Sequence, residues 1–217
     1  MDHPDLPTAL KAFDRRERGL VVGWALDNVS FSPGFEFRSQ LERILPKDCG
    51  PVSADAFVAM DYELRWLYGA LAWSSLGKTT GELTPKDPES DLPELNWLNE
   101  DADLLVAYSK GATTQLVLIE AKGYTSWDRE QIDRKVARHR ELFSPSGSRF
   151  PGVCPHLVFA GPKAPTKGEA DWADWMLRDG EPAFIPLPQP TGSKYRMTLG
   201  KADSGVWSIK PSKWPGS

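Results

Sequence analysis

The segment QLVLIEAK, Gln115 to Lys122, begins as an aliphatic run and ends with a carboxylate and an amine two residues apart. Residues two apart in a β-strand point to the same side, so Glu120 and Lys122 share a face with Leu116 and Leu118. The intervening residues are also apolar and face the other way. A strand that is apolar on both faces is expected at the centre of a sheet, with its charged end in a cleft, at an edge or in an ion pair.

A second strand precedes this one. DLLVAY, residues 103–108, is followed by the turn SKGATT, residues 109–114, so the two strands are predicted to pair as a hairpin. The start of the first strand then lies opposite the end of the second. Asp103 is therefore expected close to Glu120 and Lys122, and Asp101 is an alternative to Asp103.

Helical patterns lie on both sides of this hairpin. Residues 53–77 are predicted to form one long helix that Ser53 or Asp55 caps and Gly77 ends. A second helix is predicted over residues 125–143, with Thr125 and Asp128 as a capping box. HLVFAG, residues 156–161, is the buried strand expected after such a crossover helix.

The fold class that follows is α/β or α+β, a mixed sheet flanked by helices in a single domain over residues 1–217. The last forty residues hold short β-like runs (AFIPL, YRMTL and VWSIK), which predict a C-terminal hairpin or meander that closes the domain. The predicted long helix is apolar on a second side, which carries Trp66 and Trp73. We expect that side to pack against the N-terminal segment, with a homodimer interface as the alternative.

Composition limits the possible functions. The 217 residues are 40% hydrophobic and 26% charged, values typical of a folded domain, and the net charge of −4 argues against passive electrostatic binding of nucleic acid. It leaves open an enzyme with a locally basic groove. Cys49 and Cys154 have no metal-type spacing, and no leader-like segment is recognised, so a cytoplasmic location is expected.

Two carboxylates at one point repel each other unless a cation lies between them. Oxygen ligands of this kind suit Mg²⁺, with Mn²⁺ as a substitute, and a lysine beside them can orient or help deprotonate an attacking water. This set of groups predicts metal-assisted hydrolysis of a phosphodiester. The alternative is a simple ion pair between Glu120 and Lys122 at the rim of the sheet.

At Asp103, Glu120 and Lys122 the sequence resembles the PD-(D/E)xK nuclease superfamily, which has the restriction-endonuclease-like fold. The resemblance covers about residues 53–161, with residues 1–52 and 162–217 as elaborations, and departs from the motif at Ala102, where the family has proline. It implies a Mg²⁺-dependent nuclease, with endonuclease action on DNA as the expectation. In that reading Asp103, Glu120 and the carbonyl of Ala121 hold the metal and Lys122 positions the water.

The resemblance also implies supporting residues on the helices. An acid before the hairpin corresponds to Asp61, with Glu63 as second choice, and a glutamine on the following helix corresponds to Gln131. Arg134, Lys135 and Arg138 follow on that helix and could meet phosphates, although a solvated face is equally expected.

Trp127 could stack on a base, although burial at the helix start is the more common fate of such a residue. The rival function is a nuclease fold that has lost its chemistry and serves as a binding module in a nucleoprotein or defence complex.

Overall fold

The fold was analysed in a computed structural model, which describes residues 3–14, 17–29, 31–76, 100–123, 127–187, 194–199 and 207–212. Its helices are α1 (Leu6–Phe13), α2 (Glu17–Ala25), α3 (Phe35–Ile44), the 3-10 turn η1 (Lys47–Cys49), α4 (Leu64–Leu76), α5 (Arg129–Phe143) and the 3-10 turn η2 (Asp174–Met176). Its strands are β1 (Phe57–Glu63), β2 (Asp101–Lys110), β3 (Thr113–Ala121), β4 (Val153–Gly161), β5 (Leu177–Arg178), β6 (Glu181–Pro186), β7 (Lys194–Leu199) and β8 (Trp207–Ser212).

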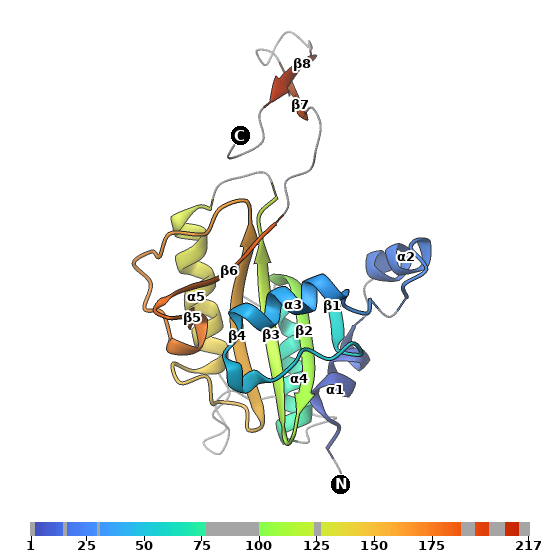
Figure 1. The fold of residues 1–217 in the computed structure, drawn as a ribbon, viewed down its shortest axis with the longest axis vertical. Helices are drawn as coiled ribbons and strands as arrows, with labels where there is room; N and C mark the ends of the chain where they lie inside the picture. Colours follow the sequence, from blue (N-terminus) through green and yellow to red (C-terminus); the bar gives the residue numbers. More distant parts are fainter. Residues whose placement is uncertain are drawn as a thin grey trace.

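The body of the protein is one six-stranded mixed sheet in the order β1-β2-β3-β4-β6-β5, with helices on both faces (Figure 1). β1, β2 and β3 are antiparallel neighbours, and β4 and β6 continue the sheet in parallel with β3. The fold class is therefore mixed α/β, as the sequence predicted.

β3 is the central strand, as its two apolar faces predicted. Leu116 and Leu118 belong to the core that α1, α4 and α5 cover, whereas Val117 and Ile119 belong to the core that α3 covers. Glu120 therefore lies on the α5 side of the sheet, two residues beyond Leu118.

The β2–β3 hairpin is tighter than the predicted six-residue turn. Lys110 pairs with Thr113, so Gly111 and Ala112 make the reversal, and Gly111 has φ +59°, a value that glycine adopts without strain. The start of β2 and the end of β3 thus lie together at the opposite end of the hairpin from this turn.

The prediction of one helix over residues 53–77 was wrong in its first half. Residues 57–63 form β1, in which Phe57, Ala59 and Tyr62 are buried, and the helix α4 starts at Leu64. The segment contains good helix formers, but its pairing with β2 outweighs local propensity.

The N-terminal segment packs against α4, as expected from its second apolar side. Trp73 contacts Phe13 of α1 edge to face, with ring centroids 6.3 Å apart. α2 lies to one side of the sheet in Figure 1, and its residues Leu20 and Trp24 are 60% and 78% exposed. No helix among the described residues is long and apolar enough to cross a bilayer.

The C-terminal β segments are present, but they do not all close the domain. β6 joins the main sheet beside β4, whereas β7 and β8 pair with each other in a separate two-stranded sheet that lies apart from the body in Figure 1. The expectation of a closing meander is thus correct for β6 and wrong for the β7–β8 hairpin.

Candidate metal and catalytic site

A pocket of about 170 Å³ lies where β2 begins and β3 ends. It is lined by residues of β2, β3, β4, α5 and the segment before α5: Asp101, Asp103, Glu120, Ala121, Lys122, Trp127, Gln131, Ile132, Lys135 and Phe159. The structure thus brings together the two predicted acids, the lysine and Gln131, although they come from three elements.

Glu120 is the most buried charged residue of this pocket. Its side chain is 2% exposed, and its Oε2 lies 2.5 Å from Nζ of Lys135. Its Oε1 forms no hydrogen bond with any residue that the structure describes. Burial raises the pKa of Glu120 from 4.5 to about 7, opposed by the ammonium of Lys135 and reinforced by Asp103 and Asp101.

Asp103 joins the two strands of the hairpin at the pocket. Its Oδ2 accepts a hydrogen bond from the backbone N–H of Ala121, with 2.6 Å between the heavy atoms. The bond holds the Asp103 carboxylate beside the end of β3, one residue from Glu120. It fixes one carboxylate oxygen and leaves the other available to a ligand.

Lys122 follows the last residue of β3 and lies in the same pocket. Its backbone N–H donates to the carbonyl of Ala160 on β4, over 2.8 Å. Across the described ranges its ammonium pairs with no carboxylate, so the expected alternative of a Glu120–Lys122 ion pair is wrong.

α5 supplies the remaining polar groups. Asp128 caps its N-terminus by accepting from the N–H groups of Glu130 and Gln131, at 2.9 and 3.4 Å. Gln131 and Lys135 are four residues apart and both line the pocket. The sequence did not predict the contact of Lys135 with Glu120, because Arg134 and Arg138 also lie at helical spacing from Gln131 and nothing in the sequence of α5 distinguishes the three.

Arg134 and Arg138, the two arginines predicted to contact phosphates, form ion pairs with Glu100, which is not a pocket residue. Nε of Arg134 lies 3.8 Å from Oε1 of Glu100, and Nη1 of Arg138 contacts the same oxygen. Neither arginine lines the pocket. Contact of these arginines with a nucleic acid stays a prediction. Arg134, with a side chain 53% exposed, is more accessible to a ligand than Arg138, which is 20% exposed.

Trp127 lines the pocket but is held by two neighbours. Its ring packs edge to face on Phe159, with centroids 5.1 Å apart, and its Nε1–H donates to the carbonyl of Lys163 over 2.9 Å. The half-buried indole forms one wall of the site. Stacking of this ring on a base stays a prediction.

Asp61 and Glu63 do not line the pocket, and the helix on which they were placed is the strand β1. Glu63 pairs with Arg65. Asp61 lies between the residues that pair with Leu104 and Ala102, and so beside Asp103 on the neighbouring strand, with φ +47°. Aspartate tolerates this left-handed backbone better than most residues. The helical position inferred for Asp61 was wrong, but the strand brings it next to the site.

The donor set fits one hard divalent cation. Among the described residues, the buried Oε1 of Glu120 has no hydrogen-bond partner. Asp103 uses Oδ2 to accept from the N–H of Ala121, so its second carboxylate oxygen could bind a cation, and the carbonyl of Ala121 is adjacent to Glu120 in sequence. No group of three or more His, Cys, Asp or Glu residues that could bind a metal occurs in the part of the chain that is described. Mg²⁺ does not require such a group, because it keeps several waters and takes few protein carboxylates.

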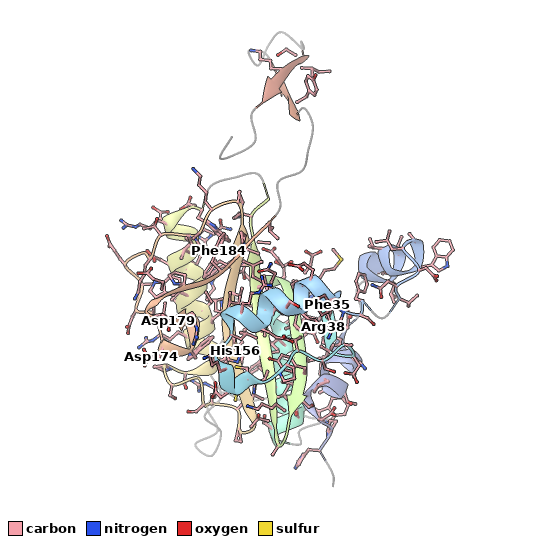
Figure 2. The ribbon with its side chains drawn as sticks, in the orientation of Figure 1. Phe35, Arg38, His156, Asp174, Asp179 and Phe184 are labelled. Carbon is pink, nitrogen blue, oxygen red and sulfur yellow. The ribbon has the colours of Figure 1, made fainter. Side chains whose placement is uncertain are left out.

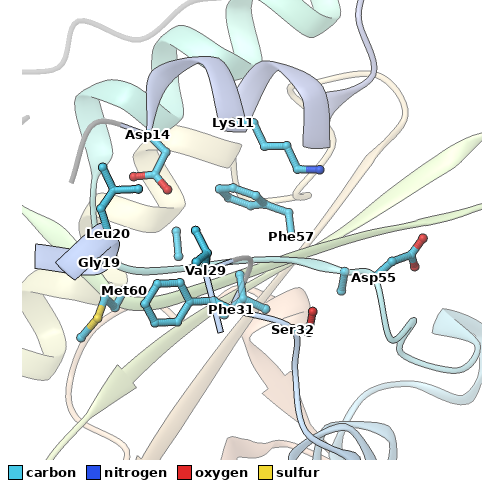
Figure 3. Close-up of a pocket in the computed structure, with 13 residues that line it drawn as sticks. Lys11, Asp14, Gly19, Leu20, Val29, Phe31, Ser32, Asp55, Phe57 and Met60 are labelled. Atoms are coloured by element: carbon cyan, nitrogen blue, oxygen red, sulfur yellow. The ribbon is translucent and has the colours of Figure 1, made fainter. Parts of the chain in front are cut away.

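Larger hollows lie elsewhere and are less suited to chemistry. A pocket of about 400 Å³ lies beside the edge strand β1, lined mainly by apolar residues that include Leu20, Val29, Phe31 and Phe57 (Figure 3). Its charged groups, among them Lys11 and Asp14, do not converge on a buried carboxylate.

Cys49 and His156 form a buried polar contact on the face of the sheet that α3 covers. Sγ of Cys49 lies 3.5 Å from Nε2 of His156, which also contacts Oε1 of Gln115 at 2.9 Å. Of these three residues, His156 is labelled in Figure 2. Burial raises the pKa of Cys49 to about 11 and lowers that of His156 to about 4, so both groups are neutral near pH 7. Cys49 therefore packs in the core as a neutral thiol.

The chain was compared with protein-family models, curated proteins and solved structures, and none of them matches it.

Proposed function

We propose that the protein is a divalent-metal-dependent nuclease of the PD-(D/E)xK type, which hydrolyses phosphodiester bonds of DNA with Mg²⁺ or Mn²⁺. One observation carries the proposal: Glu120 is a carboxylate with 2% exposure whose Oε1 has no hydrogen-bond partner among the described residues, in a pocket that also holds Asp103 and Lys122. Lys135 pairs with the other oxygen only, and a buried carboxylate oxygen left unsatisfied is costly. A cation-binding role accounts for that cost.

The order of elements supports the same family. Three antiparallel strands, β1 to β3, are followed by α5 and by β4 in parallel with β3. The resemblance implies the order helix, meander, helix and strand; the succession after β1 follows it, but α4 lies between β1 and β2 and not before the meander. We propose a restriction-endonuclease-like core over about residues 53–161.

Each side chain has a role in the proposed reaction. Asp103, Glu120 and the carbonyl of Ala121 would hold the metal, which when bound supplies Lewis-acid polarisation of the scissile phosphate. Lys122, whose ammonium forms no ion pair with a described carboxylate, orients the attacking water and offsets phosphate charge. Gln131 lines the same pocket and can hold a water or a phosphate oxygen.

Cleavage assays with purified protein test the function. Supercoiled plasmid and single- and double-stranded DNA and RNA oligonucleotides are incubated with Mg²⁺, with Mn²⁺ or with chelator. We expect metal-dependent cleavage of DNA that Glu120→Gln and Lys122→Ala abolish. Lys110→Ala is the matched control, because Lys110 is exposed at the turn at the other end of the hairpin.

The inactive binding module is the competing outcome of the same assay. Lys135 already neutralises Glu120 in the structure, as a fold without chemistry would allow. Nucleic acid bound without cleavage under every metal would favour the module. Cleavage that persists in both variants would remove Glu120 and Lys122 from the mechanism.

A further inference from the structure

Lys135 places its ammonium beside the buried carboxylate of Glu120. Its Nζ is 2.5 Å from Oε2 of Glu120 and 3.3 Å from the backbone carbonyl of Asp101. Both acceptors are oxygens at the wall of the pocket, so the ammonium is bound by the kind of ligand that a hard metal ion also uses.

Other cationic side chains of α5 form ion pairs with acids other than Glu120. Arg134 and Arg138 contact Glu100, and Arg140 contacts Asp171. Within the described residues, Lys135 is the group that forms an ion pair with Glu120. The charge of the buried carboxylate is thus balanced by one ammonium on one flexible stem.

A divalent ion and the Lys135 ammonium cannot both bind the Glu120 carboxylate without electrostatic repulsion between them. The pocket is small, about 170 Å³, and a metal held by Glu120 would lie close to a second positive charge in a poorly screened environment. Lys135 is also able to leave, because its side chain is 14% exposed and lysine carries its charge at the end of four methylene groups.

We propose that Lys135 is an internal counterion of the metal-free site, and that a divalent cation enters by displacing its ammonium from Glu120. The inference rests on the proposed function, since it requires that Glu120 be a metal ligand. It assigns Lys135 a positioning role: its ammonium holds the Glu120 carboxylate in place until metal binds. Occupation of the site and release of Lys135 are then one exchange.

Amine labelling tests the exchange without a cleavage assay. The protein is treated with an acetylating reagent with and without saturating Mn²⁺, and the labelled fraction of each lysine is measured by mass spectrometry. Binding of Mn²⁺ is followed in the same samples by the electron paramagnetic resonance signal of the free ion. Lys110, which is exposed at the β2–β3 turn, is the internal reference.

The expected result is that Mn²⁺ binds and that labelling of Lys135 rises several-fold while that of Lys110 is unchanged. In Glu120→Gln, Lys135 should label strongly without metal, and Mn²⁺ should add nothing. Mn²⁺ binding that is lost in Glu120→Gln but leaves Lys135 labelling unchanged in the wild-type protein would overturn the exchange and keep the metal site. Absence of Mn²⁺ binding would overturn both the exchange and the metal premise of the proposed function.

Discussion

Glu120, the residue on which the site depends, lowers the stability of the folded protein near neutral pH. Burial raises the pKa of Glu120 to about 7, so its ionised form is disfavoured even beside Lys135. A raised carboxyl pKa contributes stability that is complete below the unfolded value, here 4.5, and is lost as pH rises through 7. Near neutral pH the fold therefore carries a cost at this residue.

Glu120→Gln should accordingly stabilise the protein while removing metal-dependent cleavage. At pH 8 we expect the free energy of unfolding to rise by about 1 to 3 kcal/mol, because a neutral amide replaces a disfavoured buried charge and the flexible Lys135 side chain can turn its ammonium to water. The gain should shrink toward pH 5, where Glu120 is protonated. Urea denaturation at both pH values measures it, and Glu63→Gln is the isosteric control in a more exposed pair, with a change below about 1 kcal/mol.

The choice between Asp103 and Asp101 as the first acid is also decided at single residues. Asp103 accepts from the N–H of Ala121 and is thereby fixed beside Glu120, whereas Asp101 lies two residues earlier at the start of β2. We expect Asp103→Asn to lower cleavage by on the order of 100-fold or more and Asp101→Asn by much less, measured as initial rates at saturating Mg²⁺. The reverse order would assign the metal to Asp101.

At the scale of elements, α5 holds the pocket through its N-terminus. Asp128 caps the first turn, and Gln131 and Lys135 follow on the pocket side. Loss of the cap in Asp128→Ala should lower the free energy of unfolding by about 1 kcal/mol, as measured by urea denaturation. Asp128→Ser keeps an oxygen acceptor and should cost less; equal losses in the two variants would show that the cap hydrogen bonds contribute little.

The elements that could be predicted from the sequence are those whose signals are local. The apolar run of β3 and the turn before it are each readable within a few residues, and β2, β3, α5 and β4 were all predicted. The start of α5 was not, because the helix begins at Arg129 with Asp128 itself as its cap; Thr125, the expected start of a capping box, lies outside the described residues. β1 was missed, because its identity depends on pairing with β2, about 45 residues away along the chain.

The site could be predicted in part for the same reason. Strand period and hairpin register placed Asp103, Glu120 and Lys122 together in advance, and the structure brings all three into one pocket. The position of Asp61 depended on the missed strand. The partner of Lys135 depended on the docking of α5 against the sheet, and nothing in the sequence of α5 alone separates Lys135 from the two arginines that contact Glu100.

At the scale of the whole molecule, burial of titratable groups on both faces of the sheet sets the response to pH. His139 lies on the α5 side and His156 on the α3 side. Burial lowers the pKa of each from 6.5 to about 4. The pKa of Glu120 is raised from 4.5 to about 7, so its effect on stability has the opposite sign over a similar range of pH. Two histidines against one carboxyl favour net loss of stability as the solution is acidified.

The direction follows from proton binding. A histidine with a depressed pKa contributes stability that is complete above its unfolded value, near 6.5, and is lost as pH falls toward its folded value, near 4. Between pH 7 and 4.5 the unfolded chain takes up protons that the folded protein excludes. In His139→Leu, the loss of unfolding free energy between these pH values should be smaller than in the wild-type protein by about 2 to 3 kcal/mol.

Thermal or urea unfolding at pH 7 and 4.5 measures this difference, and His3→Ala, a change at an exposed residue, should leave it unaltered. The Leu side chain also removes the hydrogen bond from Nδ1 to the carbonyl of Lys135, so stability at one pH alone is not informative; the difference between the two pH values isolates the proton. An unchanged difference would mean that His139 takes up its proton without unfolding. The packing of α5 against the sheet would then be open enough to admit water to His139, which is 1% exposed in the structure.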